Sequence, residues 1–204
     1  MTMTKLCGFR TQETVRHAVE LQCDFIGLNF VPTSPRFVTL ENAAAIVRQN
    51  RNETAFVGVF MDQAEEDIRS TLQRVKLDYL QFHGNETASF CDGFDKPYIR
   101  ALNVSESFDF PTIAEQYPNA YAFLLDAAGK GGGSGETFNW HRFPKATSKR
   151  VILAGGLRPD NVGEAIRTTN PWGVDVASGI ENTNHTKNLA LMTQFMQEVR
   201  RVSA

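Results

Sequence analysis

The chain has 204 residues, of which 42% are hydrophobic and 22% are charged, and its formal net charge is −2. These values are typical of a globular protein, and the scattered lysines and arginines argue against a nucleic-acid or membrane-binding surface. No run approaches the roughly 20 apolar residues of a membrane span, and we expect no cleaved signal peptide. The three cysteines, Cys7, Cys23 and Cys91, are an odd number without metal-type spacing, which predicts free thiols and a cytoplasmic protein.

Short apolar runs alternate with amphipathic stretches from the start of the chain to its end. The apolar runs predict strands over residues 5–7, 25–30, 55–60, 78–82, 97–101, 122–125, 151–154 and 172–176. The amphipathic stretches predict helices over residues 11–21, 41–50, 64–75, 87–91, 113–117 and 189–202, with a short turn near Trp140. One more helix is predicted to start on Asp160 or Asn161, because either side chain can cap it.

The order of these elements predicts one domain over residues 1–204. Strands that each lead into a helix imply right-handed crossovers and parallel strands buried on both faces. A closed (β/α)8 barrel, the TIM barrel, competes with an open doubly wound sheet. The α/β barrel is favoured, because this length is near the lower size limit of that fold and no G-x-G-x-x-G opens the first helix. The glycine-dense segment 129–135 is too short for an interdomain hinge and follows the sixth strand.

Polar and small residues occupy the places where the predicted strands end, and barrel enzymes build their sites there. These residues are Cys7, Arg36, His83, Asp126, Gly155, Gly156, Ser178 and Gly179. Glycines and a small hydroxyl after the seventh and eighth strands leave backbone N–H groups available for an anion, which predicts a phosphate site. For Gly155 and Gly156, a tight turn without a ligand is the alternative.

Cys7 and Asp126 follow strands on opposite sides of the predicted ring, so each can point into its mouth. This arrangement suits a base and an acid that face one substrate. The alternatives are structural, since an isolated cysteine is usually a small buried hydrophobe and an aspartate after a strand often caps a turn. Cys23 and Cys91, at the end of one helix and within another, are expected to be structural.

Eight short blocks, in order along nearly the whole chain, resemble those of the phosphoribosylanthranilate isomerases of tryptophan biosynthesis. They are KLCG at residues 5–8, SPRF at 34–37, QFHG at 81–84, LD at 125–126, GSGETFNW at 133–140, LAGGL at 153–157, PDNV at 159–162 and GVDVASGIE at 173–181. Each block is modest evidence, but the ordered set is specific. The departures are mild: Phe9-Arg10-Thr11 stands where Ile-Thr-Arg is more usual, and Phe82 where leucine is common.

The resemblance implies an Amadori rearrangement of N-(5-phosphoribosyl)anthranilate to 1-(2-carboxyphenylamino)-1-deoxyribulose 5-phosphate, without a metal or cofactor. It implies that Asp126 protonates the ribose ring oxygen and that Cys7 removes the proton from C2. Arg36 is expected to bind the anthranilate carboxylate, because a guanidinium can hold it bidentately. The alternative for Arg36 is an ordinary surface charge. His83 is expected either to line the pocket or to hydrogen-bond a loop.

Lys5 lies two residues before Cys7 and therefore on the same face of the first strand. The thiol of a free cysteine has a pKa of about 8.5, and a nearby ammonium is expected to lower the pKa of Cys7. The slightly favoured alternative for Lys5 is a buried ion pair with Asp175 at the pocket, since an unpaired lysine inside a barrel would be costly.

We expect a small phosphorylated substrate, no nucleic-acid or membrane partner, and either a monomer or a homodimer. The nearest rival is the histidine-pathway aminoaldose isomerase, which performs the same chemistry with two carboxylates on a longer chain. A pentose-phosphate epimerase would need a cluster of histidine and aspartate metal ligands. A non-catalytic phosphate-binding barrel is the alternative from another class.

Overall fold

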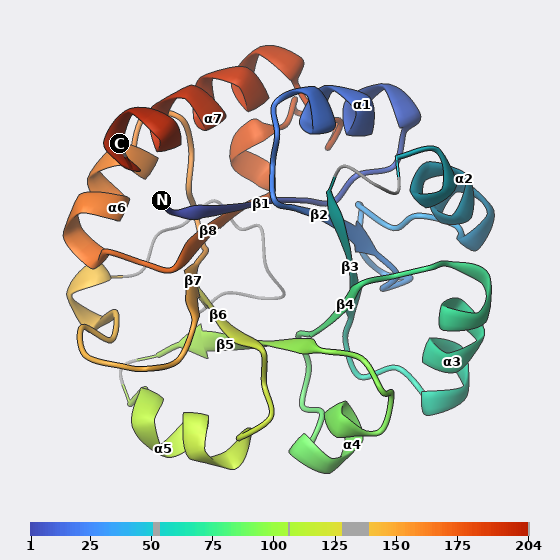
Figure 1. The fold of residues 1–204 in the computed structure, drawn as a ribbon, viewed down its shortest axis with the longest axis horizontal. Helices are drawn as coiled ribbons and strands as arrows, with labels where there is room; N and C mark the ends of the chain where they lie inside the picture. Colours follow the sequence, from blue (N-terminus) through green and yellow to red (C-terminus); the bar gives the residue numbers. More distant parts are fainter. Residues whose placement is uncertain (51–53, 106, 128–138, 204) are drawn as a thin grey trace.

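The computed structural model describes residues 1–50, 54–105, 107–127 and 139–203. Eight parallel strands close into a barrel in which each strand pairs with its sequence neighbours and β1 pairs with β8 (Figure 1). The strands are β1 (Met3–Cys7), β2 (Phe25–Asn29), β3 (Ala55–Phe60), β4 (Tyr79–Phe82), β5 (Tyr98–Val104), β6 (Ala122–Ala127), β7 (Val151–Leu153) and β8 (Gly173–Val176). The predicted closed α/β barrel is confirmed.

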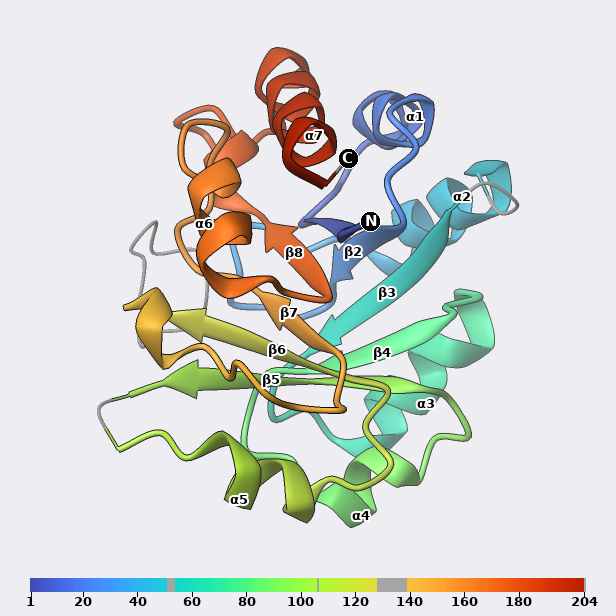
Figure 2. The same ribbon diagram turned by 60° about the vertical axis from the view of Figure 1, so that its left-hand side comes forward.

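Helices surround the barrel on its outer side, and α7 lies beside α1 where the ring closes (Figures 1 and 2). The α-helices are α1 (Gln12–Glu20), α2 (Leu40–Asn50), α3 (Glu65–Arg74), α4 (Ala88–Asp92), α5 (Phe110–Gln116), α6 (Val162–Thr169) and α7 (Leu189–Ser203). Two short 3-10 helices, η1 (Trp140–Arg142) and η2 (Ser178–Ile180), complete the elements of the described residues. The predicted turn near Trp140 is therefore a 3-10 helix.

Several elements are longer than their sequence patterns predicted, and β5 and α5 show the largest extensions. β5 continues to Val104, because each of its residues from Ile99 onward pairs with β6. α5 begins at Phe110, where Pro111 occupies the first turn, a position that tolerates the missing N–H. The extension of β5 therefore depends on pairing with β6, whereas the start of α5 follows from a proline in its first turn.

The start of α6 differs from the expected capping. Asn161 is the N-cap residue, but its side chain makes no capping hydrogen bond. Instead its Oδ1 accepts from the Arg158 backbone N–H at 2.8 Å, and its Nδ2 donates to the Gly156 carbonyl at 2.9 Å. This side chain therefore fixes the glycine turn after β7 rather than the helix.

The core has one layer inside the barrel and another between the strands and the helices. Successive strand residues point to opposite faces, so Leu6 packs in the outer layer while Lys5 and Cys7 point inward. The inner layer consists of Phe25, Val57, Ile99, Ala101, Ala122, Leu124, Ile152 and Ala154. Inward positions beyond this layer are free to carry polar side chains.

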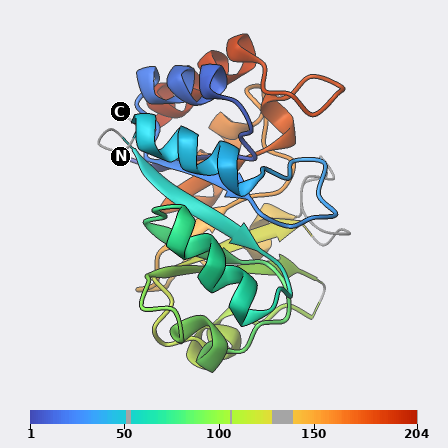
Figure 3. The same cartoon turned by 90° about the vertical axis from the view of Figure 1, so that its right-hand side faces the viewer.

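Both chain termini lie at one end of the barrel, and the strand arrowheads point toward the other (Figure 3). The glycine-dense segment 129–135 lies outside the described residues. Among the described residues, no helix combines the length and the apolar character needed to cross a membrane.

Candidate active site

A cavity of about 620 Å³ lies at the carboxyl ends of the strands. Its lining includes eight of the nine residues predicted as site residues, namely Cys7, Arg36, His83, Asp126, Gly155, Gly156, Asp175 and Ser178. Gly179 does not line the cavity, because it packs behind the wall against the Leu157 carbonyl. The barrel therefore brings residues from six strand ends to one space.

Cys7 ends β1 and is buried beside the backbone of Gly27, where any side chain would overlap its Sγ. Burial raises the pKa of the Cys7 thiol, and the nearby Lys5 ammonium offsets only part of that increase. The expectation that Lys5 lowers the pKa of Cys7 below its ordinary value is therefore wrong. The physical reason is that desolvation disfavours the thiolate more than one cation, itself bound to a carboxylate, favours it.

Lys5 and Asp175 are register partners on β1 and β8, and Lys5 Nζ donates to Asp175 Oδ1 at 2.8 Å. Burial alone would lower the pKa of Lys5, but the Asp175 carboxylate and Cys7 raise it above its ordinary value. The predicted ion pair is confirmed. It keeps a cation at the floor of the cavity without leaving an unpaired charge.

Asp126 lies in β6 and His83 directly follows β4, and both side chains are largely buried. His83 Nε2 lies 3.8 Å from Asp126 Oδ2. Burial, with the positive charges of Lys5 and Arg100, lowers the pKa of His83 to about 4, although Asp175 acts in the opposite direction. His83 is therefore a neutral imidazole at pH 7, and it faces the cavity rather than a loop.

Arg36 reaches the cavity from the loop after β2, and its stem packs over Gly8, which has φ +88°. Its Nε and Nη2 donate to the two carboxylate oxygens of Glu181, each at 2.8 Å. Lys187 Nζ donates to Glu181 Oε1 at 2.6 Å and to the Ala177 carbonyl at 3.0 Å. Glu181 is thus a buried bridge between the β2 loop and the loop after β8.

The three charges in this bridge do not cancel. Burial opposes ionisation of Glu181, yet Arg36 and Lys187 hold its pKa below the ordinary range. Glu181 therefore carries one negative charge between two cationic side chains, which leaves a net positive charge at this wall of the cavity. The second edge of the Arg36 guanidinium, formed by Nη1 and Nη2, remains able to bind a carboxylate.

The turn after β7 adopts a conformation that glycine allows. Gly155 has φ +81° and Gly156 has φ +61°. Among the described residues neither amide donates to a carbonyl, and the turn lies next to Ser178 at the start of η2 along the cavity wall. These N–H groups form a polar cradle that suits an anion.

Comparison with known proteins agrees with this geometry. A family model described as N-(5'phosphoribosyl)anthranilate (PRA) isomerase matches residues 4–198. The chain belongs to the phosphoribosylanthranilate isomerase family. The N-(5'-phosphoribosyl)anthranilate isomerase of Nitrosococcus oceani is 42% identical over 204 residues, covering 99% of each chain.

Solved structures of this isomerase family superpose on the chain over nearly its whole length. The phosphoribosyl anthranilate isomerase of Thermotoga maritima has a TM-score of 0.90 at 30% identity, covering 98% of this chain and 100% of that one. The Thermus thermophilus isomerase has a TM-score of 0.89 at 30% identity with the same coverage. A further isomerase, with a TM-score of 0.84 at 28% identity over 98% of this chain and all of its own, was solved with reduced 1-(o-carboxyphenylamino)-1-deoxyribulose 5-phosphate.

Gln81 and Glu181 were not predicted as site residues from the sequence. Gln81 lines the cavity two residues before His83, and Glu181 is the buried partner of Arg36. Both residues lie inside blocks that resemble the family, and a polar residue at an inward strand position was the available signal for Gln81. No local signal connects Glu181 with a residue 145 positions earlier.

Substituting Gly179 by alanine tests whether the isomerase needs close backbone packing behind its anion cradle. A Cβ at this position would overlap the Leu157 carbonyl oxygen, so the backbone of the cradle must shift. We expect Gly179→Ala to raise the KM for the phosphorylated substrate and to lower the free energy of unfolding by about 1–3 kcal/mol. Steady-state kinetics and thermal unfolding measure both effects. Gly93→Ala is the control, because a Cβ there meets its nearest atom at 3.3 Å; equal KM values for the two variants would contradict this role.

Proposed function

We propose that this chain converts N-(5-phosphoribosyl)anthranilate into 1-(2-carboxyphenylamino)-1-deoxyribulose 5-phosphate, with Asp126 as general acid and Cys7 as general base. The family assignment over residues 4–198 supports the reaction. The observation that supports the residue roles is the position of both side chains in the wall of one cavity, on strands at different places around the ring.

The reaction is an internal redistribution of electrons and protons. The anthranilate nitrogen pushes its lone pair toward C1, the bond from C1 to the ring oxygen breaks, and Asp126 gives a proton to that oxygen. The iminium that results makes the C2 hydrogen acidic, and Cys7 removes it as a proton. The enolamine then takes a proton at C1 and gives up the proton of its C2 hydroxyl, so that C2 becomes the ketone. The substrate gains two protons and loses two, and the sum requires no oxidant or reductant.

The raised pKa of Cys7 fits the second step in a specific way. At pH 7 the thiolate is a minority form, but a thiolate whose conjugate acid has a higher pKa is a stronger base. Lys5 stands two residues away and stabilises the thiolate while it exists. Asp175 holds Lys5 in that position.

Two anionic groups of the substrate fit two walls of the cavity. We assign the phosphate to the amides of Gly155, Gly156 and Ser178, with Gly179 behind them. We assign the anthranilate carboxylate to Arg36, whose free guanidinium edge can bind it bidentately. The substrate then extends from the β7 and β8 loops to the β2 loop and passes between Cys7 and Asp126.

A fluorescence assay and a growth test examine the reaction itself. The chain should abolish the fluorescence of freshly formed N-(5-phosphoribosyl)anthranilate, and it should restore growth of a tryptophan auxotroph that lacks this isomerase. A non-catalytic phosphate-binding barrel would bind the substrate without loss of fluorescence. Size measurements in solution would show whether the enzyme is a monomer or a homodimer, and its cytoplasmic location remains a prediction.

Removing Arg36 should affect binding more than turnover. We expect Arg36→Ala to raise KM by about 10- to 100-fold, the loss of roughly 1.5–3 kcal/mol from a charge-assisted hydrogen bond. Glu181→Gln should raise KM by a smaller factor, because the guanidinium remains but loses its ionic partner. Arg74→Ala is the control, since Arg74 makes an exposed ion pair with Glu41. An unchanged KM in Arg36→Ala would place the carboxylate site elsewhere.

A further inference from the structure

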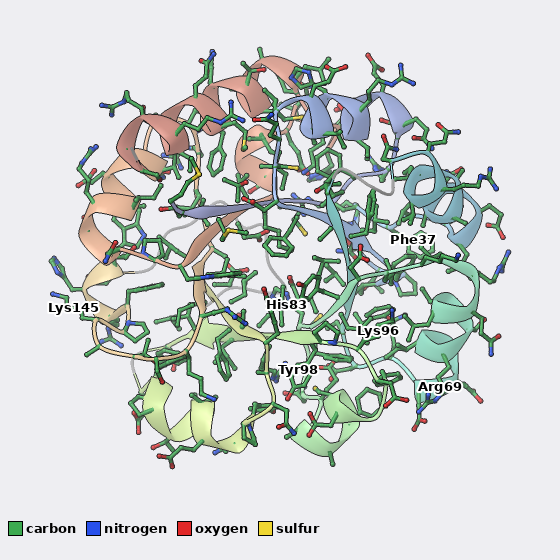
Figure 4. All side chains as sticks on the ribbon, viewed as in Figure 1. Phe37, Arg69, His83, Lys96, Tyr98 and Lys145 are labelled. Atoms are coloured by element: carbon green, nitrogen blue, oxygen red, sulfur yellow. The ribbon has the colours of Figure 1, made fainter. Side chains whose placement is uncertain are left out.

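His83 and Gln81 form a polar pair that the two proton transfers do not use. The two residues occupy successive inward positions, Gln81 within β4 and His83 directly after it. Figure 4 places His83 near the centre of the ring, whereas Arg69 and Lys96 lie on its outer side. The pair therefore belongs to the interior of the barrel, where polar groups need partners.

The contact between the two side chains fixes the proton on the imidazole. Gln81 Nε2 lies 3.3 Å from His83 Nδ1. An amide nitrogen can donate a hydrogen bond but cannot accept one, so Nδ1 is the acceptor. A neutral imidazole that accepts at Nδ1 carries its hydrogen on Nε2.

The surroundings of His83 keep the imidazole neutral. The ring is buried, and the cations Lys5 and Arg100 outweigh the carboxylate of Asp175, so that its pKa is about 4. His83 Nε2 lies 3.8 Å from Asp126 Oδ2, and the two groups would form an ion pair only if the ring were protonated. At pH 7 the contact is instead one between a neutral N–H and a carboxyl group.

The Nε2 atom is buried and has no hydrogen-bond partner among the described residues. The same holds for the Oε1 atom of Gln81, the other polar end of the pair. Buried polar atoms that lack protein partners at a cavity wall are suited to bind a ligand. Both residues line the cavity, so a substrate bound there lies next to this pair.

The backbone around His83 is held on both sides. The His83 amide donates to the Phe60 carbonyl at 2.9 Å. Arg100 donates to the carbonyls of Phe82 at 2.9 Å and Gly84 at 2.7 Å, and Glu86 accepts from the Gly84 amide at 2.9 Å. Such a clamped segment presents its donor in a fixed direction before the substrate arrives, which is how donors stabilise developing charge.

We propose that the Nε2–H of His83 donates a hydrogen bond to the ribose ring oxygen that Asp126 protonates, with Gln81 as the residue that sets the required tautomer. As the bond from C1 to this oxygen breaks, its electron pair stays on the oxygen. The Asp126 proton is transferred there, whereas the His83 proton stays on nitrogen and stabilises the growing charge. This role rests on the proposed isomerisation and adds a second donor to its first step.

The first test compares two substitutions of His83. His83→Leu removes the donor, and we expect kcat to fall by about 10²- to 10³-fold, as for one lost oxyanion donor. His83→Gln keeps an N–H at the distance of Nε2, and its kcat should be at least roughly tenfold above that of His83→Leu. The comparison requires that the wild type is active. A kcat for His83→Leu within about threefold of the wild-type value would then overturn this inference and leave the proposed isomerisation intact.

The second test examines the tautomer in the unmodified protein. Nitrogen-15 NMR at pH 7 should show His83 with a protonated Nε2 and an unprotonated Nδ1, and this measurement does not depend on the folding of any variant. The opposite tautomer would overturn the proposal.

A double-mutant cycle then separates positioning from packing. Gln81→Leu should lower kcat in the wild type, but it should have almost no further effect on kcat in His83→Leu, because Gln81 acts through His83. Equal losses of kcat in both backgrounds would show that Gln81 acts independently of His83.

Discussion

Asp126→Asn should reduce kcat by about 10²- to 10⁴-fold, the range expected for loss of a general acid, while KM changes little. Asparagine has nearly the same shape as aspartate, so the buried site beside His83 retains its packing. Its amide cannot supply the proton that the ring oxygen requires. The measurement is steady-state turnover from the loss of anthranilate fluorescence, with thermal unfolding as the check on folding.

Isotope substitution identifies the step that Asp126 controls. If Asp126→Asn slows ring opening, the C2 proton is removed only afterwards, and substrate deuterated at C2 should turn over as fast as normal substrate. Asp95→Asn is the matched control, because Asp95 is exposed and its φ of +52° is well tolerated by asparagine. A kcat for Asp126→Asn close to that of Asp95→Asn would remove Asp126 as the acid.

Cys7→Ser should lose a comparable factor in kcat, because a serine hydroxyl is a far weaker acid than a thiol and does not form the required base at neutral pH. Here the C2 proton transfer becomes the slow step, so the deuterated substrate should react more slowly than the normal one. The two variants are thus expected to give opposite isotope results. The same isotope effect in both would mean that the two residues do not divide the steps as assigned.

The pH at which Cys7 ionises provides an independent check. Because burial raises the pKa of its thiol, Cys7 is less ionised at pH 8.5 than a free cysteine, which titrates at about that pH. Thiolate absorbance of the wild type minus that of Cys7→Ser should therefore be small up to this pH and grow above it. A thiolate already formed at pH 7 would contradict the sign of the shift.

Cys23 and Cys91 supply the controls for these thiol experiments. Both are free and buried like Cys7, and burial raises the pKa of each to about 12. Cys23→Ala and Cys91→Ala should lower stability through lost packing, but they should keep the wild-type kcat when assayed well below their melting temperatures. A comparable loss of kcat in these variants would indicate a general effect of thiol removal.

The sequence supplied more of the fold than of the site geometry. Alternation within β1 places Lys5 and Cys7 on one face of the strand. This two-residue period is a local property and is visible in the sequence. The strand ends, the glycine turn after β7 and the blocks that resemble the family are equally local. These features predicted the barrel and most of the cavity wall.

Contacts between residues far apart in the sequence could not be predicted in this way. Nothing near Glu181 identifies Arg36 as its partner, because the contact joins loops on two strands that meet only when the barrel closes. Asp160 or Asn161 was expected to cap α6, yet the side chain of the N-cap residue Asn161 bonds the Gly156 carbonyl and the Arg158 amide instead. When a side chain has several possible partners nearby, the path of the backbone determines which of them it bonds.

The amino-acid sequence by itself determined which residues are strand ends, which side chains share a face, and which family the blocks resemble, since these depend on neighbours along the chain. Only the tertiary structure shows the direction in which the pKa values of Cys7 and His83 shift. A pKa responds to desolvation and charge from all directions, and the groups that set these two come from several strands of the closed ring.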